Sequence, residues 1–85
     1  MQNNSKKIKN LEDLISRIKA GQNEFFVSLA GGNVRSSKNI WFDENSRSFT
    51  VYNEIDGTTQ ECTESQILTE TNIGKALESG ALFAY

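Results

Sequence analysis

The chain has 85 residues, which is enough for one hydrophobic core and one domain. Hydrophobic residues make up 36% of it and charged residues 24%, with a formal net charge of -2, and this balance excludes a disordered chain. No apolar run approaches the roughly 20 residues that cross a bilayer, and no apolar segment follows the N-terminal lysines as it does in a secretory signal. We therefore expect a cytoplasmic protein without a membrane partner.

The titratable residues restrict the chemistry further. There is no histidine, and Cys62 is the only cysteine, so neither a disulfide within the chain nor a zinc site of the usual ligands can be built. We predict no bound metal and no cofactor. Residues 1–42 carry seven basic and three acidic residues, whereas residues 43–85 carry two basic and eight acidic ones. This asymmetry either steers a charged partner or interleaves on the surface of one globule.

The first predicted element is a helix. Residues 1–9 are mostly polar, and we expect them to fray, with a single domain over residues 10–85. Asn10 can cap the helix start and Gly21 suits the left-handed residue that ends it. The apolar stripe between them has the spacing of one helical face and consists of Leu11, Leu14, Ile15 and Ile18.

Four strand-like segments follow the helix, at residues 24–30, 39–43, 48–55 and 58–62. A four-residue turn joins the second segment to the third and sets Phe42 opposite Phe49. Asp56-Gly57 is the pair most typical of a two-residue hairpin loop, and such a loop sets Val51 opposite Cys62. The four segments are therefore predicted to form an antiparallel meander.

The C-terminal third is predicted to be helical. Residues 63–66 fit a capping box, with Thr63 at the cap and Gln66 reaching back. A further helix is expected over residues 72–79, with Gly80 at its end. Residues 81–85 are too apolar to float free, and they either dock on the core or add a short strand.

Together these elements predict an α+β fold of order α-β-β-β-β-α, a two-layer sandwich of a four-stranded antiparallel meander with helices at both ends. Side chains alternate along each strand and so define two sheet faces. The more apolar face, which we expect the helices to cover, carries Phe25, Val27, Leu29, Ile40, Phe42, Phe49, Val51, Ile55 and Cys62. The other face carries Phe26, Ser28, Trp41, Thr50, Tyr52 and Glu61.

The stretch "GGNVRSSK", residues 31–38, admits two interpretations. A glycine-rich backbone can cradle an anion, but this stretch leads into a strand and lacks the Walker spacing. We interpret it as a connection between strands, kept in water by Arg35 and Lys38. Ser37 and Lys38 point to opposite faces and cannot act as a nucleophile and its base. We predict no catalytic residues and no enzyme activity.

The second sheet face is the candidate binding site. Phe26, Trp41 and Tyr52 lie on three neighbouring strands and can form one aromatic patch, with Arg35 and Lys38 as the cations placed to help. The same rings could stack on the bases of single-stranded nucleic acid, although the net charge of -2 disfavours a phosphate partner. In a third interpretation the apolar C-terminal tail folds over the patch and makes it a second small core.

Three stretches, "VRSSKNIWFD", "VYNEIDGTTQE" and "TNIGKALESGALF", carry a resemblance. The chain resembles a set of short bacterial and phage proteins in which an Arg-Ser-Ser-Lys run precedes a strand and an Asn-Ile-x-x-Ala helix ends the chain. The likeness covers about residues 11–85 and brings no assigned function. It implies a bacterial or mobile-element origin, and proteins of this size from such sources often bind and modulate a host protein.

From these features we expect a small non-catalytic protein-binding module, such as a regulator or inhibitor of a host protein. The alternative is single-stranded nucleic-acid binding through the aromatic sheet face. Salt separates the two, because phosphate binding weakens steeply with ionic strength whereas apolar docking weakens much less.

Overall fold

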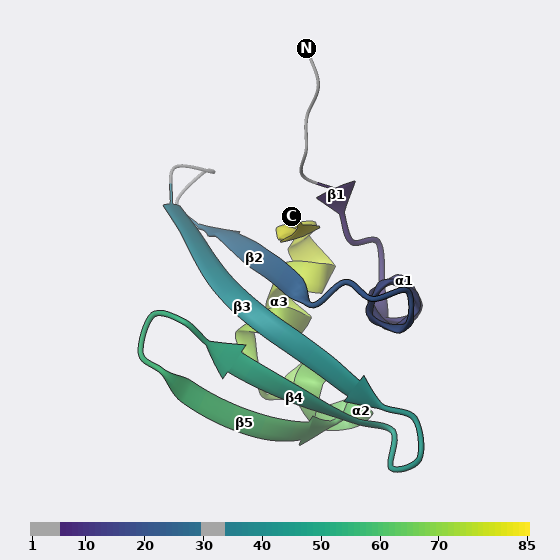
Figure 1. The fold of residues 1–85 in the computed structure, drawn as a ribbon. Helices are drawn as coiled ribbons and strands as arrows, with labels where there is room; N and C mark the ends of the chain where they lie inside the picture. The colour runs from purple at the N-terminus through teal and green to yellow at the C-terminus, as the bar shows by residue number, and fades with distance from the viewer. Residues whose placement is uncertain (1–5, 30–33) are drawn as a thin grey trace.

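The structure is a computed structural model that describes residues 6–29 and 34–85. Over these residues a six-stranded antiparallel sheet has the strand order β1-β6-β2-β3-β4-β5 (Figure 1). In chain order the elements are β1 (Lys6–Lys7), α1 (Leu11–Lys19), β2 (Glu24–Leu29), β3 (Val34–Asp43), β4 (Ser48–Asn53), β5 (Thr58–Thr63), α2 (Glu64–Thr69), α3 (Asn72–Ser79) and β6 (Leu82–Ala84).

The two-layer α+β fold is confirmed, but the predicted element order is incomplete. The meander of β2, β3, β4 and β5 forms as expected. Strands β6 and β1 extend the sheet beyond β2, so the apolar tail adds a strand instead of only docking on the core. In Figure 1, α2 and α3 lie behind the sheet, and buried residues of all three helices share one core cluster with one sheet face.

The prediction that residues 1–9 fray is wrong for residues 6–8, whereas residues 1–5 lie outside the described residues. Lys6 pairs with Ala84 and Lys7 with Phe83. Ile8 is fully buried, and its N–H donates to the Leu82 carbonyl oxygen at 2.9 Å. The polar composition of this segment hides the pairing, because the acceptor strand lies at the opposite end of the sequence.

The first helix begins and ends as predicted. The Asn10 side chain accepts a hydrogen bond from the Asp13 N–H at 2.9 Å, which satisfies one of the free donors of the first turn. At the other end Gly21 has a φ of +102°, a backbone conformation that is strained for any residue with a side chain. The buried residues Leu14, Ile15 and Ile18 place the helix on the core.

The hairpin between β3 and β4 has the predicted register. Phe42 lies opposite Phe49 and Trp41 opposite Thr50, across a four-residue loop over residues 44–47. The Asp43 side chain accepts from the Asn45 N–H at 2.9 Å and starts the turn. Arg47 ends it with a φ of +52°, the left-handed conformation that glycine adopts at lower cost.

The hairpin between β4 and β5 differs from the prediction by two residues. Cys62 pairs with Phe49 instead of Val51, and the loop has four residues, 54–57, instead of two. Side chains explain the longer loop: the Asn53 oxygen accepts from the Ile55 N–H at 3.1 Å, and Asp56 accepts from the Thr58 N–H at 3.0 Å. Because a shift of two keeps every side chain on its face, Cys62 still lies in the core.

The two C-terminal helices agree with the prediction. Thr63 and Gln66 form both hydrogen bonds of the capping box, at 3.1 and 3.0 Å. The second helix spans residues 72–79, and Gly80 ends it in the left-handed conformation. Gly74 lets the two helices meet, because a Cβ at this position would lie 2.0 Å from the Leu68 carbonyl oxygen.

The predicted core face is confirmed with two exceptions. Leu29, at the end of β2, and Ile55, at the tip of the second loop, are exposed. Phe42 is partly buried and packs against the core. The other predicted members are buried: Phe25, Val27, Ile40, Phe49, Val51 and Cys62.

Candidate functional site

The sheet face turned away from the core is the candidate site, and we call it the open face. The strand registers bring together there the aromatic side chains of β2, β3, β4 and β6. Phe26 lies opposite Phe83, and Tyr52 lies opposite Asn39, which makes it a diagonal neighbour of Trp41. The shared face of Phe26, Trp41 and Tyr52 is therefore as the alternation of the strands predicts.

One end of the open face is covered by the C-terminal tail. Phe83 stacks on Phe26 with ring centroids 5.3 Å apart, and the Tyr85 ring lies 4.7 Å from the same ring. The Arg35 guanidinium lies 4.5 Å from the Phe26 centroid. Phe26 is left only 3% exposed, so it supports the sheet and is not free to contact a partner.

The other end of the open face is accessible. Trp41 is 44% exposed and Tyr52 is 37% exposed. Trp41 and Tyr85 line a shallow hollow of about 370 Å³ together with Glu24 and Asn39. Exposed aromatic side chains beside a hollow are the usual anchors of a partner.

The walls of this hollow are held in place. The Tyr85 hydroxyl is hydrogen-bonded to Ser37 Oγ at 2.8 Å, and its N–H donates to the Glu24 carbonyl oxygen at 3.2 Å. On the opposite side the Asn23 side chain donates to the Ile40 carbonyl oxygen at 3.1 Å, next to Trp41. A site fixed in this way loses little conformational entropy when it is filled.

The open face has charges of both signs. Arg35 is exposed, and Glu24 and Glu61 share the face with it. Glu24 lines the hollow, whereas the guanidinium of Arg35 lies over the buried ring of Phe26. This end of the face is therefore polar to acidic around an aromatic centre, which suits a cationic group better than a phosphate.

The structure separates Lys38 from the other predicted binding residues. Arg35 and Lys38 are an odd number of positions apart on one strand, so Lys38 lies on the core face when Arg35 lies on the open face. Lys38 is only 7% exposed there. Burial lowers the pKa of the Lys38 ammonium from its ordinary value, and the charge of Asp56 partly offsets this. The grouping of Lys38 with Arg35, Trp41 and Tyr52 as one binding set is thus wrong in its geometry.

The interpretation in which the C-terminal tail folds over the patch is confirmed at Phe26 but not at Trp41, and two tail residues absent from the predicted binding set complete the site. Phe83 and Tyr85 both contact Phe26, and Tyr85 also lines the hollow. The alternation of side chains along a strand indicates their position: Leu82 and Ala84 are buried in the core, so Phe83 and Tyr85 point to the open face. The interpretation of residues 31–38 as a connection between strands is wrong for residues 34–38, which belong to β3, and Lys38 is buried instead of keeping the stretch in water. Residues 31–33 lie outside the described residues.

The remaining groups are structural. Cys62 is 2% exposed, and burial raises the pKa of its thiol, as expected of a residue that packs as a small hydrophobe. Within residues 6–29 and 34–85, no three His, Cys, Asp or Glu side chains gather as a metal site would require. Among the described helices, none is both long enough and apolar enough to span a bilayer.

Comparison with known proteins yields no relative for this chain. No family model, no curated protein and no solved structure matches it. The resemblance to short bacterial and phage proteins accordingly stays a prediction.

Proposed function

We propose that this domain is a non-catalytic protein-binding module that docks a protein partner on its open face. The observation that carries the proposal is Trp41, which is 44% exposed at the rim of a hollow whose other aromatic wall is Tyr85. Exposed aromatic side chains at a fixed hollow are the usual anchors of binding partners.

The chemistry of the hollow indicates what the partner presents. Two rings and the Glu24 carboxylate surround the space, together with the amide side chains of Gln22 and Asn39. A lysine or arginine side chain meets all of these needs at once, since it stacks on aromatic rings and pairs with a carboxylate. We therefore propose a partner that inserts a basic side chain between Trp41 and Tyr85.

The experiment compares capture of partners from an extract of the native host by three forms of the domain. Trp41→Ala removes the anchor, and Ile55→Ala is the matched control, because Ile55 is 68% exposed at a hairpin tip away from the hollow. We expect a protein that is retained by the wild type and by Ile55→Ala and lost with Trp41→Ala. Loss of an anchor costs about 2 kcal/mol, or roughly 30-fold in affinity.

The charge of the hollow is tested on the same partner once it is purified. Glu24→Gln is expected to weaken binding several-fold, whereas Glu61→Gln, on the edge strand β5, leaves it unchanged.

Equal retention of the same proteins by the wild type and Trp41→Ala contradicts the proposal. Nuclease-sensitive capture, or quenching of Trp41 by an oligothymidine with a steep salt dependence, decides for single-stranded nucleic acid instead.

A further inference from the structure

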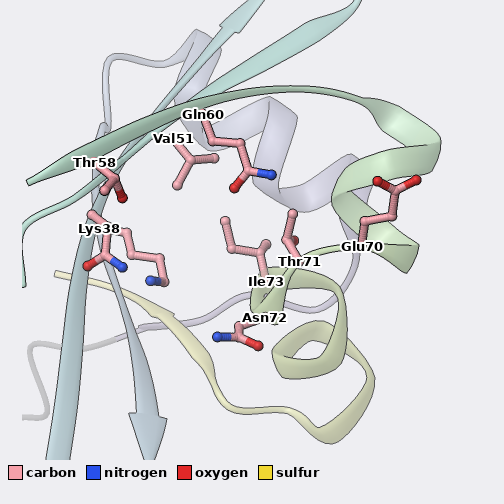
Figure 2. Close-up of a pocket in the computed structure, with 9 residues that line it drawn as sticks. Lys38, Val51, Thr58, Gln60, Glu70, Thr71, Asn72 and Ile73 are labelled. Carbon is pink, nitrogen blue, oxygen red and sulfur yellow. The ribbon is translucent and has the colours of Figure 1, made fainter. Parts of the chain in front are cut away.

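A second pocket lies on the helix side of the sheet, where β3, β4 and β5 meet the start of α3 (Figure 2). Its volume is about 190 Å³. Lys38 comes from β3, Thr58 and Gln60 from β5, and Asn72 from the first turn of α3. The pocket is separated from the open face by the thickness of the sheet.

Lys38 is the unusual residue of this pocket. Its side chain is 7% exposed and lies between Phe25 and Asn53 on the neighbouring strands. Figure 2 shows its ammonium directed into the pocket, with Gln60 and Asn72 on other sides. The stem of Lys38 is buried, whereas its ammonium still reaches the water of the pocket, so a bound anion replaces that water as its partner.

No such partner is present among the described residues. Neither a hydrogen bond nor an ion pair within 4.0 Å joins Lys38 Nζ to any of them. Asp56 acts on Lys38 through its charge and not through a hydrogen bond, and its Oδ1 accepts from the Thr58 N–H at 3.0 Å and from the Thr58 hydroxyl at 2.7 Å. The Lys38 charge therefore faces the pocket with its donors free.

The start of α3 supplies a second, independent set of donors. Thr71 occupies the N-cap position but makes no cap hydrogen bond, and its hydroxyl donates instead to the Ile67 carbonyl oxygen at 2.6 Å. The first N–H groups of this eight-residue helix thus lack a side-chain cap, and Asn72 and Ile73 line the pocket. A helix N-terminus attracts negative charge through these N–H groups and the helix dipole.

We propose that this pocket binds the carboxylate of a small organic acid, held between Lys38 Nζ and the first turn of α3. Its volume corresponds to about six water molecules, which excludes nucleotides and drug-sized ligands. Glu70 lines another part of the wall and, with Asp56 nearby, favours a ligand with one negative charge over one with two. Val51 and Ile73 provide an apolar surface for a few carbon atoms.

The test is a titration of the isotope-labelled protein with sodium acetate, followed by NMR at constant ionic strength kept with sodium chloride. We expect saturable shift changes at the amides of Asn72, Ile73 and Gln60, with half-saturation in the millimolar range. Lys38→Met is expected to weaken this binding at least 10-fold. Lys75→Met is the matched control, because Lys75 is an exposed lysine on the same helix, and it leaves the titration unchanged.

A second variant tests the pocket without removing the Lys38 charge. Gln60→Glu places a carboxylate inside the pocket without a change of length, and this internal group is expected to displace acetate. A parallel titration with inorganic phosphate separates the ligand classes, and tighter binding of phosphate than of acetate overturns the assignment to a carboxylate. Shift changes that do not saturate, or that persist in both pocket variants, overturn the site itself.

Discussion

The two faces of β3 depart from the usual distribution of side chains in opposite directions. On the core face, Lys38 is a cation that is only 7% exposed. On the open face, Trp41 is the largest aromatic side chain and is 44% exposed. Cations are almost never fully buried without a partner, and a large aromatic side chain gains free energy from burial. Each departure costs stability, and each coincides with a pocket that a ligand could fill.

The difference between these positions lies in what surrounds them. The stem of Lys38 is buried between Phe25 and Asn53, and this burial lowers the pKa of its ammonium, so the contribution of Lys38 to stability depends on pH. Trp41 sits on a surface where water already reaches it, so its replacement disturbs the fold little. Substitutions on the two faces should therefore have distinct signatures in stability and in binding.

The largest expected loss of stability comes from a substitution on the core face. Phe49 is fully buried between β4 and the helices, and Phe49→Ala should lower the free energy of unfolding by about 4 kcal/mol, through lost apolar contacts and a cavity. Urea denaturation followed by circular dichroism measures this loss. A loss below about 1 kcal/mol would contradict the assignment of this face to the core.

The covered end of the open face should behave as a second, smaller core. Phe26→Ala removes the ring that Phe83, Tyr85 and Arg35 contact, and we expect a loss of about 3 kcal/mol. Tyr52→Ala on the accessible part of the same face is the control and should cost much less. Equal losses in the two variants would show that the open face is not divided in this way.

Lys38→Met is expected to raise the free energy of unfolding, in contrast to the two substitutions above. At neutral pH the variant should be more stable than the wild type by about 1 kcal/mol, because an apolar side chain replaces an ammonium that is partly desolvated and forms no hydrogen bond with the described residues. Burial lowers the Lys38 pKa below its unfolded value of 10.5, against the smaller effect of Asp56.

The pH dependence of this difference follows from linkage. Between the folded and unfolded pKa values of Lys38, the unfolded chain holds the proton that the folded protein has released, so wild-type stability rises with pH. The advantage of Lys38→Met is therefore complete below this window and shrinks as the pH approaches 10.5. Denaturation of both proteins at neutral and alkaline pH measures it, and a constant difference would mean that Lys38 is not buried as a cation.

Trp41→Ala should have the smallest effect on stability, about 1 kcal/mol or less, since nearly half of the side chain is already in water. Its fluorescence provides the check on the intact protein. We expect a red-shifted emission that acrylamide quenches readily. A blue-shifted, protected emission would mean that the open face is covered at Trp41 as it is at Phe26.

Much of the fold could be predicted because its signals are local. The helix between Asn10 and Gly21, the capping box at Thr63 and the register across residues 44–47 depend on neighbours within a few positions. The register of the second hairpin differs from the prediction for a local reason as well. Asp56-Gly57 alone indicates a two-residue loop, whereas the Asn53 side chain accepts from the Ile55 N–H and starts a longer one.

The remaining failures come from contacts between distant parts of the chain. Neither Lys6 nor Lys7 signals a strand by composition, and the sequence left a docked tail and a short strand as alternatives for residues 81–85, which only the pairing with β2 decides. The alternation of β3 already placed Lys38 on the core face, but its charge suggested exposure. No sequence pattern indicates that the helix start at Thr71 lies beside it, because packing of α3 against the sheet brings them together.

The position of β6 between β1 and β2 determines the order in which the sheet can assemble. The meander of β2 to β5 joins strands that are adjacent in sequence, and such hairpins close at low entropic cost. In contrast, β1 pairs with β6 alone, so it gains its place only after β6 has added to the edge of β2. The N-terminal strand is therefore the last to dock during folding and the first to detach, and its amide protons should exchange with solvent before those of the meander.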